Sequence, residues 1–436
     1  MNKIYKLFSL LFLAFAFLFQ SCDFFESKSI SQAEITEIIK PKTLWTFIIY
    51  MAGDNELSSV LIDDLNELEA ANAVSDELQI YALVDYAGNG ATNYNSGTFL
   101  YKIKNDINDS SQILSEKIQC SSLGISLEEN ASEKNLADKN VLENLIDFVK
   151  QESPSEEFGL IMWGHGTGYR NGNIQSGKGL AVDDNSEDFM SIVDFGEAVR
   201  DKGLSIIGFD TCFGMLLETV YEIKNDGKYF IGSSGLVPVS GWDYKTLFRD
   251  FSEKLHSSED LSLAFCKIAK NQFDNQYSNE DKIEISYVDL SRVWDIYNGF
   301  EAFAKKLSEH IVDVGSQAKI FETIFYEVKS YCGNTSPTDM YLDLYSFAEK
   351  MLEYGFEEGE VLKVQLFQNE KKLNMGVHFI PLLYSNVTAE RHGSSYIKNE
   401  DTYNEKKLKF VEENQFWVPS LPPSNSVLDK LFYTNY

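Results

Sequence analysis

Two stretches of the chain pair an apolar strand with reactive side chains: GLIMWGHGTG at residues 159–168 and LSIIGFDTCFG at residues 204–214. The apolar run of each predicts a buried strand. The first strand is followed by His165, and the second by Asp210 and Cys212. Working side chains of open α/β sheets gather at the carboxyl ends of their strands. If the two strands are neighbours, His165 and Cys212 meet as base and nucleophile.

The surrounding sequence alternates short apolar runs with amphipathic stretches. Strands are expected over residues 43–52, 79–85, 159–163, 204–209 and 229–233, and helices over 58–71, 136–150, 191–200 and 213–223. A hairpin is expected over 98–103 and 112–118, followed after about residue 245 by helices over 261–273, 292–312 and 340–354 and a late strand over 375–380. Strands alternating with helices predict an α/β fold with a mostly parallel sheet covered on both faces.

The composition is that of a globular protein and excludes one class of partner. The 436 residues are 44% hydrophobic and 24% charged, which is ordinary for a folded chain. There are 67 acidic and 38 basic residues, which give a net charge of −29. Binding nucleic acid requires a cationic surface, so this balance argues against nucleic acid as a partner. We expect a monomer.

The N-terminus predicts export. Lys3 and Lys6 precede an apolar run over residues 7–19, which would span roughly 20 Å as a helix and is too short for a bilayer core of about 30 Å. Ser21 before Cys22 resembles a bacterial lipobox, in which the cysteine is acylated and becomes the new N-terminus. An ordinary signal peptide cleaved near Ser21 is the alternative. Both place the protein in the bacterial cell envelope or outside the cell.

These observations predict four parts: a lipoprotein signal peptide at 1–21, a tether at 22–42, a core at 43–245 and a helix-rich C-terminal part at 246–436 that completes or covers the core. Besides Cys22, the cysteines are Cys120, Cys212, Cys266 and Cys332, with no CxxC pair, so no zinc site is expected.

Cys212 and His165 each have a reactive and a structural interpretation. A thiol at the start of the helix expected over 213–223 would be stabilised as the thiolate by the helix dipole. Glycines next to His165 allow a substrate or a second backbone to come close. A buried small cysteine and a structural histidine are the alternatives. The two residues occur at equivalent places after two strands of one α/β unit, and this favours the reactive interpretation.

Three blocks together resemble the clostripain family, within the caspase-like clan of cysteine peptidases: WTFIIYMAGDN at 45–55, GHGTGY at 164–169 and FDTCFG at 209–214. The resemblance extends over roughly residues 42–420. It implies a caspase-like α/β/α sandwich with a mostly parallel central sheet, an additional helical C-terminal part and cysteine endopeptidase activity on protein or peptide substrates.

The resemblance also implies a role for each matching residue. Cys212 would attack the peptide carbonyl to form a thioester, and His165 would protonate the leaving amine. The backbone N–H groups of Gly166 and Cys212 would form the oxyanion hole. Asp210 would line the primary specificity pocket and favour cleavage after Arg or Lys. A helix N-cap near the following turn is the alternative for Asp210.

Members of the family are zymogens that are cut after a basic residue between the His and the Cys. Lys178 is the better candidate here, Arg170 is the second, and a loop that stays intact is the alternative. Ser233 and Ser234 end the strand before the next loop, and the resemblance implies that they help to bind substrate. The loop after them should border the substrate cleft. The family usually has acidic residues there, whereas this chain has an apolar segment at 235–240, which leaves the strength of the Arg or Lys preference open. Asp243 is a candidate to supply the missing charge.

The resemblance implies no required cofactor and leaves room for calcium, which some members need. Residues 183–184 and 187–188 offer carboxylates, although without EF-hand spacing. The rival interpretation is a catalytically silent surface lipoprotein that uses the same fold to bind proteins or peptides. A latent enzyme whose 235–240 segment blocks the cleft, and a ligase that uses the same thioester, are further alternatives.

Overall fold

β1 (Thr43–Gly53) lies inside an eight-stranded sheet with the order β10-β9-β8-β5-β1-β2-β3-β4. The structure is a computed structural model. It describes residues 43–87, 97–108, 112–127, 133–167, 179–253, 257–276, 283–310, 327–329, 331, 340–368 and 371–379, all within one compact unit, Lys42–Tyr436. The signal peptide and tether predicted over residues 1–42 lie outside the described residues.

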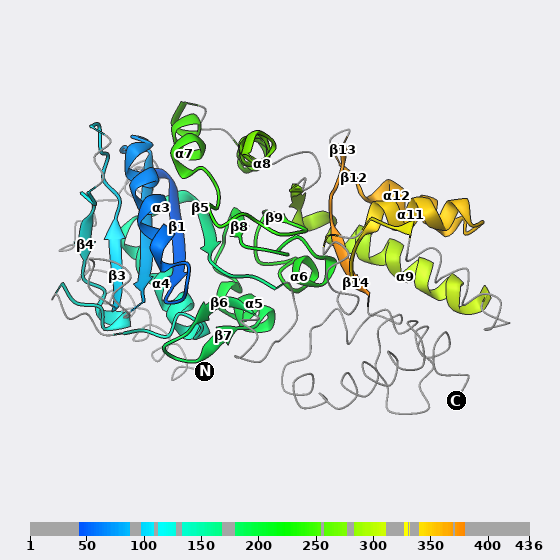
Figure 1. Cartoon of the computed structure of the whole chain (residues 1–436), viewed down its shortest axis with the longest axis horizontal. Coiled ribbons are helices and arrows are strands. Elements are labelled where there is room, and N and C mark those ends of the chain that lie inside the picture. The colour runs from blue at the N-terminus through cyan, green and yellow to red at the C-terminus, as the bar shows by residue number, and fades with distance from the viewer. Residues whose placement is uncertain are drawn as a thin grey trace, which may run out of the picture. The chain divides into compact units, whose positions relative to one another are not determined.

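The centre of the sheet is parallel and its edges are antiparallel (Figure 1). The parallel neighbours of β1 are β2 (Leu78–Tyr86) and β5 (Ser155–Trp163), followed by β8 (Ile206–Asp210) and β9 (Tyr229–Ser233). The antiparallel strands are β3 (Gly97–Lys102), β4 (Glu116–Ile118) and β10 (Ile285–Asp289). The mostly parallel sheet and the hairpin expected from the sequence are confirmed; β10 was not expected.

Side chains alternate between the two faces of the sheet, and helices cover both. On one face lie α3 (Ser58–Ala70), α7 (Tyr244–Glu253) and α8 (Ser258–Gln276). On the other lie α4 (Lys139–Glu152), α5 (Ile192–Val199), α6 (Leu217–Glu222) and α9 (Val293–His310). We call these the α3 face and the α4 face. This α/β/α layering matches the sequence-based prediction.

Aromatic packing closes the α3 face. Phe47 of β1 meets Phe248 and Phe251 of α7 edge to face, with ring centroids 5.2 and 5.3 Å apart. A Cβ atom at Gly159 of β5 would come within 2.2 Å of the Phe47 ring, so only glycine fits beside this ring. The glycine at the start of the GLIMWGHG stretch is therefore a packing requirement of the sheet that carries His165.

The chain beyond β10 adds a smaller layer. β11 (Met340–Asp343) pairs with β14 (Gly376–Phe379), and α11 (Leu344–Glu353), α12 (Glu358–Gln365), β12 (Phe367–Gln368) and β13 (Lys371–Lys372) complete it. The helix expected over 340–354 is thus half wrong. Its first four residues form a strand because they pair with β14, and Asp343 then caps α11 by accepting a hydrogen bond from the Ser346 N–H.

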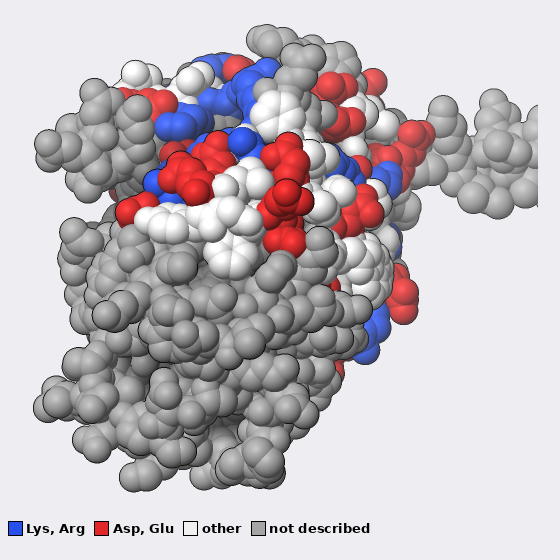
Figure 2. All heavy atoms as spheres, turned by 90° about the vertical axis from the view of Figure 1, so that its right-hand side faces the viewer, with Lys and Arg blue, Asp and Glu red and all other residues white. Residues whose placement is uncertain are grey.

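Two further features concern the surface and the membrane. Figure 2 shows acidic and basic side chains interspersed on the face of the molecule that carries α9, α11 and α12 in Figure 1. Some are joined as ion pairs, including Lys350 with Glu353 and Lys363 with Glu349. Within the part of the chain that the structure describes, no helix is both long and apolar enough to cross a membrane.

Candidate active site

The register of β5 and β8 brings the two reactive stretches together. Trp163 pairs with Asp210, so His165 and Cys212 each lie two residues beyond the same rung. The Gly164 N–H donates to the Asp210 carbonyl at 3.4 Å, which extends the contact past the strand ends. A Cβ atom at Gly166 would come within 2.5 Å of the Cys212 carbonyl oxygen. The predicted neighbourhood of the two strands is therefore correct, and the His165 loop lies directly against the Cys212 loop.

The backbones of Gly166 and Cys212, whose N–H groups are the predicted oxyanion donors, meet at this contact. Only glycine allows so close an approach, since any larger residue would push the His165 loop away from Cys212. Their role as donors remains a prediction.

Cys212 lies half-buried under the segment that follows β9. The Val237 N–H donates to the Cys212 Sγ at 3.3 Å. Burial raises the pKa of the thiol above its usual value, the Val237 N–H opposes this shift, and the charge of Asp210 adds to it. The thiol is therefore held in its neutral form near pH 7 in this conformation.

The helix-dipole argument made from the sequence is wrong. α6 begins at Leu217, five residues beyond Cys212, rather than at Phe213. Phe213 has a φ of 54° and turns the chain, and the Met215 N–H then bonds to the Ser233 carbonyl. The residues after Cys212 are tied to β9 before the helix starts, so the thiol lies outside the reach of the helix N-terminus.

His165 faces a carboxylate that the sequence did not single out. Its Nε2 atom lies 3.0 Å from Oε1 of Glu56, without the geometry of a directed hydrogen bond, and the Glu56 side chain is 73% exposed. Glu56 directly follows the block at 45–55, and this position was the only feature of the sequence that could have pointed to it. Asn55 anchors this turn by donating from Nδ2 to the carbonyls of Ala52 and Val182.

Asp210 is a buried carboxylate with one satisfied oxygen. Its Oδ2 accepts hydrogen bonds from the Trp242 N–H at 3.0 Å and the Tyr244 hydroxyl at 2.9 Å. Its Oδ1 is buried without a partner. Burial raises the pKa of Asp210 to about 7, and the two hydrogen bonds oppose that shift. The N-cap interpretation is wrong, because both donors belong to residues 242–244 rather than to the turn after β8.

Two acidic residues of α3 lie beside Asp210. Asp64 accepts a hydrogen bond from Nε1 of Trp163, and Glu67 accepts one from the Tyr244 N–H at 2.9 Å. Burial, followed by the charge of Asp210, raises the pKa of Asp64 well above its usual value, and burial raises that of Glu67 to about 7. We call Asp64, Glu67 and Asp210 the β8 carboxylates.

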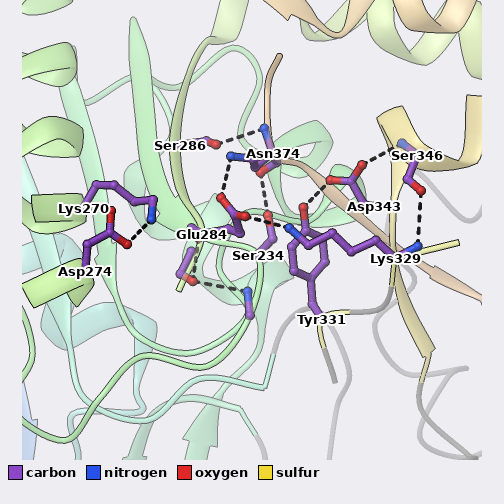
Figure 3. Close-up of polar contacts among 12 residues, drawn as sticks. Ser234, Lys270, Asp274, Glu284, Ser286, Lys329, Tyr331, Asp343, Ser346 and Asn374 are labelled. Atoms are coloured by element: carbon purple, nitrogen blue, oxygen red, sulfur yellow. Dashed lines mark hydrogen bonds and ion pairs between the residues drawn. The ribbon is translucent and has the colours of Figure 1, made fainter. Parts of the chain in front are cut away.

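The other residues expected to bind substrate make internal contacts. The Ser233 hydroxyl donates to the Glu284 carbonyl, and the Ser234 hydroxyl donates to the carbonyls of Met215 and Asn374. Figure 3 shows Ser234 in a polar network in which the Glu284 carboxylate accepts from Lys329 and Asn374. This network joins β9 and β10 to the C-terminal layer.

Asp243 is likewise engaged within the fold. Its Oδ1 accepts a hydrogen bond from the Thr246 N–H at 2.8 Å, so its carboxylate binds the first turn of α7. Its charge nevertheless contributes to the raised pKa of Glu67, which places it near the β8 carboxylates.

A tyrosine from the C-terminal layer contacts both reactive loops. The Tyr341 hydroxyl donates to the Thr167 carbonyl at 2.8 Å, and the Tyr341 ring lies 4.7 Å from that of Phe213. Thr167 follows His165 by two residues and Phe213 follows Cys212 directly. The layer after β10 therefore helps to hold the two loops together.

Several predicted residues lie outside the described part of the chain: Cys22, Arg170, Lys178 and Cys332. The three described cysteines, Cys120, Cys212 and Cys266, are free thiols.

Residues 49–417 match the clostripain family. The chain belongs to this family. Clostripain of Hathewaya histolytica is 23% identical over 354 residues, which cover 71% of this chain. The match spans 63% of the length of that relative.

Two solved structures have the same fold. One is a secreted C11 cysteine protease from Bacteroides thetaiotaomicron in complex with an irreversible peptide inhibitor, with 18% identity, a TM-score of 0.58 and coverage of 82% of this chain and 98% of that one. The other is an inactive zymogen C11 protease from Parabacteroides distasonis, with 17% identity, a TM-score of 0.59 and coverage of 84% and 99%. The chain of this clostripain-family member thus has the caspase-like α/β/α sandwich.

Proposed function

We propose that this clostripain-family chain is a cysteine endopeptidase that cleaves after Arg or Lys. One observation carries the proposal: His165 and Cys212 lie equally far beyond one rung of neighbouring strands, and the same rung contains Asp210. Cys212 would attack the carbonyl carbon and form the thioester, His165 would give a proton to the leaving amine, and water would then release the acid.

The preference for a basic residue is supported by the unpartnered Oδ1 of Asp210. A buried carboxylate oxygen that accepts no hydrogen bond is destabilised, and an Arg or Lys side chain of a substrate would satisfy it. Asp64 and Glu67 of α3 lie beside Asp210, where burial raises their pKa values, and a substrate cation would favour their ionised forms. These α3 residues would take the place of the acidic segment that is absent after β9.

The described conformation would be a resting one. The backbone N–H of Val237, in the segment at 235–240, donates a hydrogen bond to the Cys212 thiol. Gly241, directly after that segment, packs against the Asp210 carboxylate. A substrate side chain that reaches Asp210 requires this segment to move. Self-cleavage after Lys178, or after Arg170, would be the trigger, and the zymogen among the similar structures supports this part of the proposal.

The location is proposed from the N-terminus. Acylation of Cys22 would anchor the protein in the cell envelope, and cleavage near Ser21 without acylation would release it. Labelling cells with a fatty-acid analogue tests this: label that is absent from a Cys22→Ala variant is expected, and unlabelled wild-type protein would exclude the anchor.

The test of activity compares the purified wild-type chain with the Cys212→Ala variant. Cys266→Ala is the matched control, because it removes a different thiol. Fluorogenic peptides ending in Arg, Lys, Asp or Leu would be offered with and without calcium while a gel follows chain integrity. We expect turnover of the Arg and Lys peptides that only Cys212→Ala abolishes.

The same experiment separates the parts of the proposal. Cleavage only after other residues would overturn the role of Asp210 and retain the peptidase. A folded, cut chain without turnover would overturn the peptidase and favour the binding module. Variants Lys178→Ala and Arg170→Ala, each made alone, identify the self-cleavage site as the one whose loss leaves the chain intact.

A further inference from the structure

The imidazole of His165 meets a carboxylate through its Nε2 atom. This nitrogen lies 3.0 Å from Oε1 of Glu56. It is buried and makes no directed hydrogen bond within the described residues, although the side chain as a whole is 30% exposed. Buried side-chain nitrogens normally have a hydrogen-bond partner. The Glu56 side chain is 73% exposed, so rotation about its own bonds would align an oxygen with Nε2.

The backbone that carries Glu56 is fixed on both sides. Asn55, which is 5% exposed, donates from Nδ2 to the carbonyls of Ala52 at 3.1 Å and Val182 at 2.9 Å. Its Oδ1 accepts a hydrogen bond from the Leu57 N–H at 3.0 Å. These contacts tie the turn between β1 and α3 to β6 (Leu180–Asp183). The Glu56 side chain therefore reaches His165 from a fixed position.

A second acidic side chain acts on the same pair. Asp184 begins the turn between β6 and β7 (Asp188–Met190), and its N–H donates to the Asp54 carbonyl at 2.9 Å. Burial raises the pKa of Asp184, the charge of Glu56 raises it further, and the charge of His165 lowers it. Asp184 thus lies near enough to interact with both charges, whereas Glu56 makes the contact with Nε2.

The contact with Glu56 gives the two nitrogens of the ring different tasks. Both nitrogens of a protonated imidazole carry a hydrogen atom. The His165 loop lies against the Cys212 loop, since a Cβ atom at Gly166 would come within 2.5 Å of the Cys212 carbonyl oxygen. If a carboxylate holds Nε2–H, Nδ1–H is the one that can be given to a substrate. A base oriented by a third group is typical of nucleophilic catalysis.

We propose that Glu56 is a positioning residue for His165. The ionised carboxylate accepts a hydrogen bond from Nε2–H and fixes the ring with Nδ1 toward the reacting bond. The role rests on the proposed peptidase. Nδ1 takes the proton of the Cys212 thiol, the sulfur bonds to the carbonyl carbon, the C–N bond breaks, and Nδ1 passes the proton to the leaving nitrogen. Glu56 keeps its charge throughout and makes no bond to the substrate.

The exposure of Glu56 decides where its effect would be seen. An exposed ion pair contributes little to stability, because water screens it. A substrate bound between the two reactive loops would exclude water from the ring, and the same contact would then be stronger. Loss of the Glu56 carboxylate should therefore lower turnover and leave the Tm of the free protein almost unchanged.

The test depends on the leaving group of the substrate. An amide must receive a proton on its leaving nitrogen, whereas a p-nitrophenyl ester releases a stable anion that needs none. Wild type and Glu56→Gln would be given the peptide that wild type cleaves best, as an amide and as a p-nitrophenyl ester. Glu56→Gln should lower the ratio of amide to ester kcat/KM roughly ten-fold or more, with a Tm within about one degree of wild type. Both substrates are measured on one sample, so the ratio does not depend on how much of the chain has matured.

Asp184→Asn is the matched control, because it removes a negative charge from the same neighbourhood without removing the contact with Nε2. Its ratio of amide to ester kcat/KM should differ from that of wild type by less than about three-fold. A loss as large as that of Glu56→Gln would assign the effect to net charge and contradict the positioning role.

The remaining outcomes separate this inference from the proposed function. A wild-type chain that turns over neither substrate would overturn the peptidase, and the role of Glu56 with it. Turnover of both substrates by wild type, with an unchanged ratio in Glu56→Gln, would overturn the role of Glu56 alone. An equal loss on both substrates would also overturn it, because the variant would then affect attack by Cys212 or the fold rather than proton donation.

Discussion

The two acidic groups beside the reactive loops differ in what completes them. Along β2 and β8 side chains alternate, so Asp85 points to the α4 face and Asp210 to the α3 face. Each has one buried oxygen without a partner. The β8 carboxylates are contacted by the side chains of Trp163 and Tyr244, which donate hydrogen bonds. The acidic group around Asp85, which includes Asp54 and Asp183, instead accepts hydrogen bonds from backbone N–H groups and from the Thr98 hydroxyl.

The difference lies in the kind of donor that reaches each group: aromatic side chains at the β8 carboxylates, and backbone N–H groups with one threonine hydroxyl around Asp85. Under the proposed specificity, the cationic side chain of a substrate would meet Asp210 on the α3 face. The sheet itself keeps the two groups apart.

The largest expected effect separates the two groups by substrate selectivity. Asp210→Asn should lower kcat/KM for Arg and Lys peptides by roughly 100- to 10,000-fold relative to a Leu peptide, because a buried ion pair loses one partner. Asp85→Asn should leave the ratio of Arg to Leu turnover unchanged, whatever it does to the overall rate. The ratio of kcat/KM values, measured for both variants, decides this; equal loss of selectivity in the two would contradict the division of roles.

The next largest effect is on stability: Asp210→Asn should stabilise the protein although it lowers activity on Arg and Lys peptides. Burial raises the pKa of Asp210 in the folded protein to about 7, whereas its value in the unfolded chain is near 3.8. The stability that this carboxyl group contributes is therefore fully present below about pH 3.8 and is lost as the pH rises toward 7. Asp210→Asn removes this loss. Its free energy of unfolding should therefore be about 2–4 kcal/mol higher than that of wild type at pH 8 and nearly the same near pH 4.

Denaturant unfolding at the two pH values measures the change. Asp63→Asn, at an exposed position of α3, serves as the control and should be neutral at both. A variant that is less stable than wild type at pH 8 would show that the Asp210 carboxylate contributes net stability in its present environment.

A smaller effect concerns the pH profile of cleavage. A cationic substrate binds the ionised form of Asp210, so kcat/KM for an Arg peptide should rise with pH until about 7 and then level off. The Tyr244 hydroxyl stabilises the ionised form, so Tyr244→Phe should move the rise upward by up to about one pH unit. An unmoved profile would assign the rise to another group.

The smallest effect is on the thiol itself. The charge of Asp210 contributes to the raised pKa of Cys212. Asp210→Asn should therefore speed alkylation of Cys212 by iodoacetamide a few-fold at pH 8, whereas Asp85→Asn should not. Mass spectrometry of the modified cysteine distinguishes Cys212 from Cys120 and Cys266. Equal acceleration in both variants would indicate a general loosening of the fold.

Much of the layout follows from local sequence patterns. The apolar runs that end at His165 and Asp210 are buried strands, and β9 spans the expected residues 229–233. Such runs are informative because a strand in a parallel sheet is covered on both faces and is therefore apolar along its length. The family blocks at 45–55, 164–169 and 209–214 likewise identified the pair of reactive loops.

Other elements depended on partners that are distant in the chain. Met340–Asp343 lies at the start of an expected helix but pairs with β14, and α6 starts late because Met215 bonds to Ser233 of β9. The hairpin of β6 and β7 and the edge strand β10 were likewise not expected, since short strands are specified by their neighbours more than by their own residues.

The sequence by itself determined the acidic net charge, which depends on composition alone. It also determined the α/β class and the placing of His165, Asp210 and Cys212 after two buried strands, because these depend on residues close together in the chain. Tertiary structure decided what those residues meet. Glu56 reaches His165, Tyr244 reaches Asp210, and Asp54, Asp85, Glu133 and Asp183 converge. Such contacts join residues tens of positions apart, and only the register of the sheet and the packing of its layers bring them within a few ångströms.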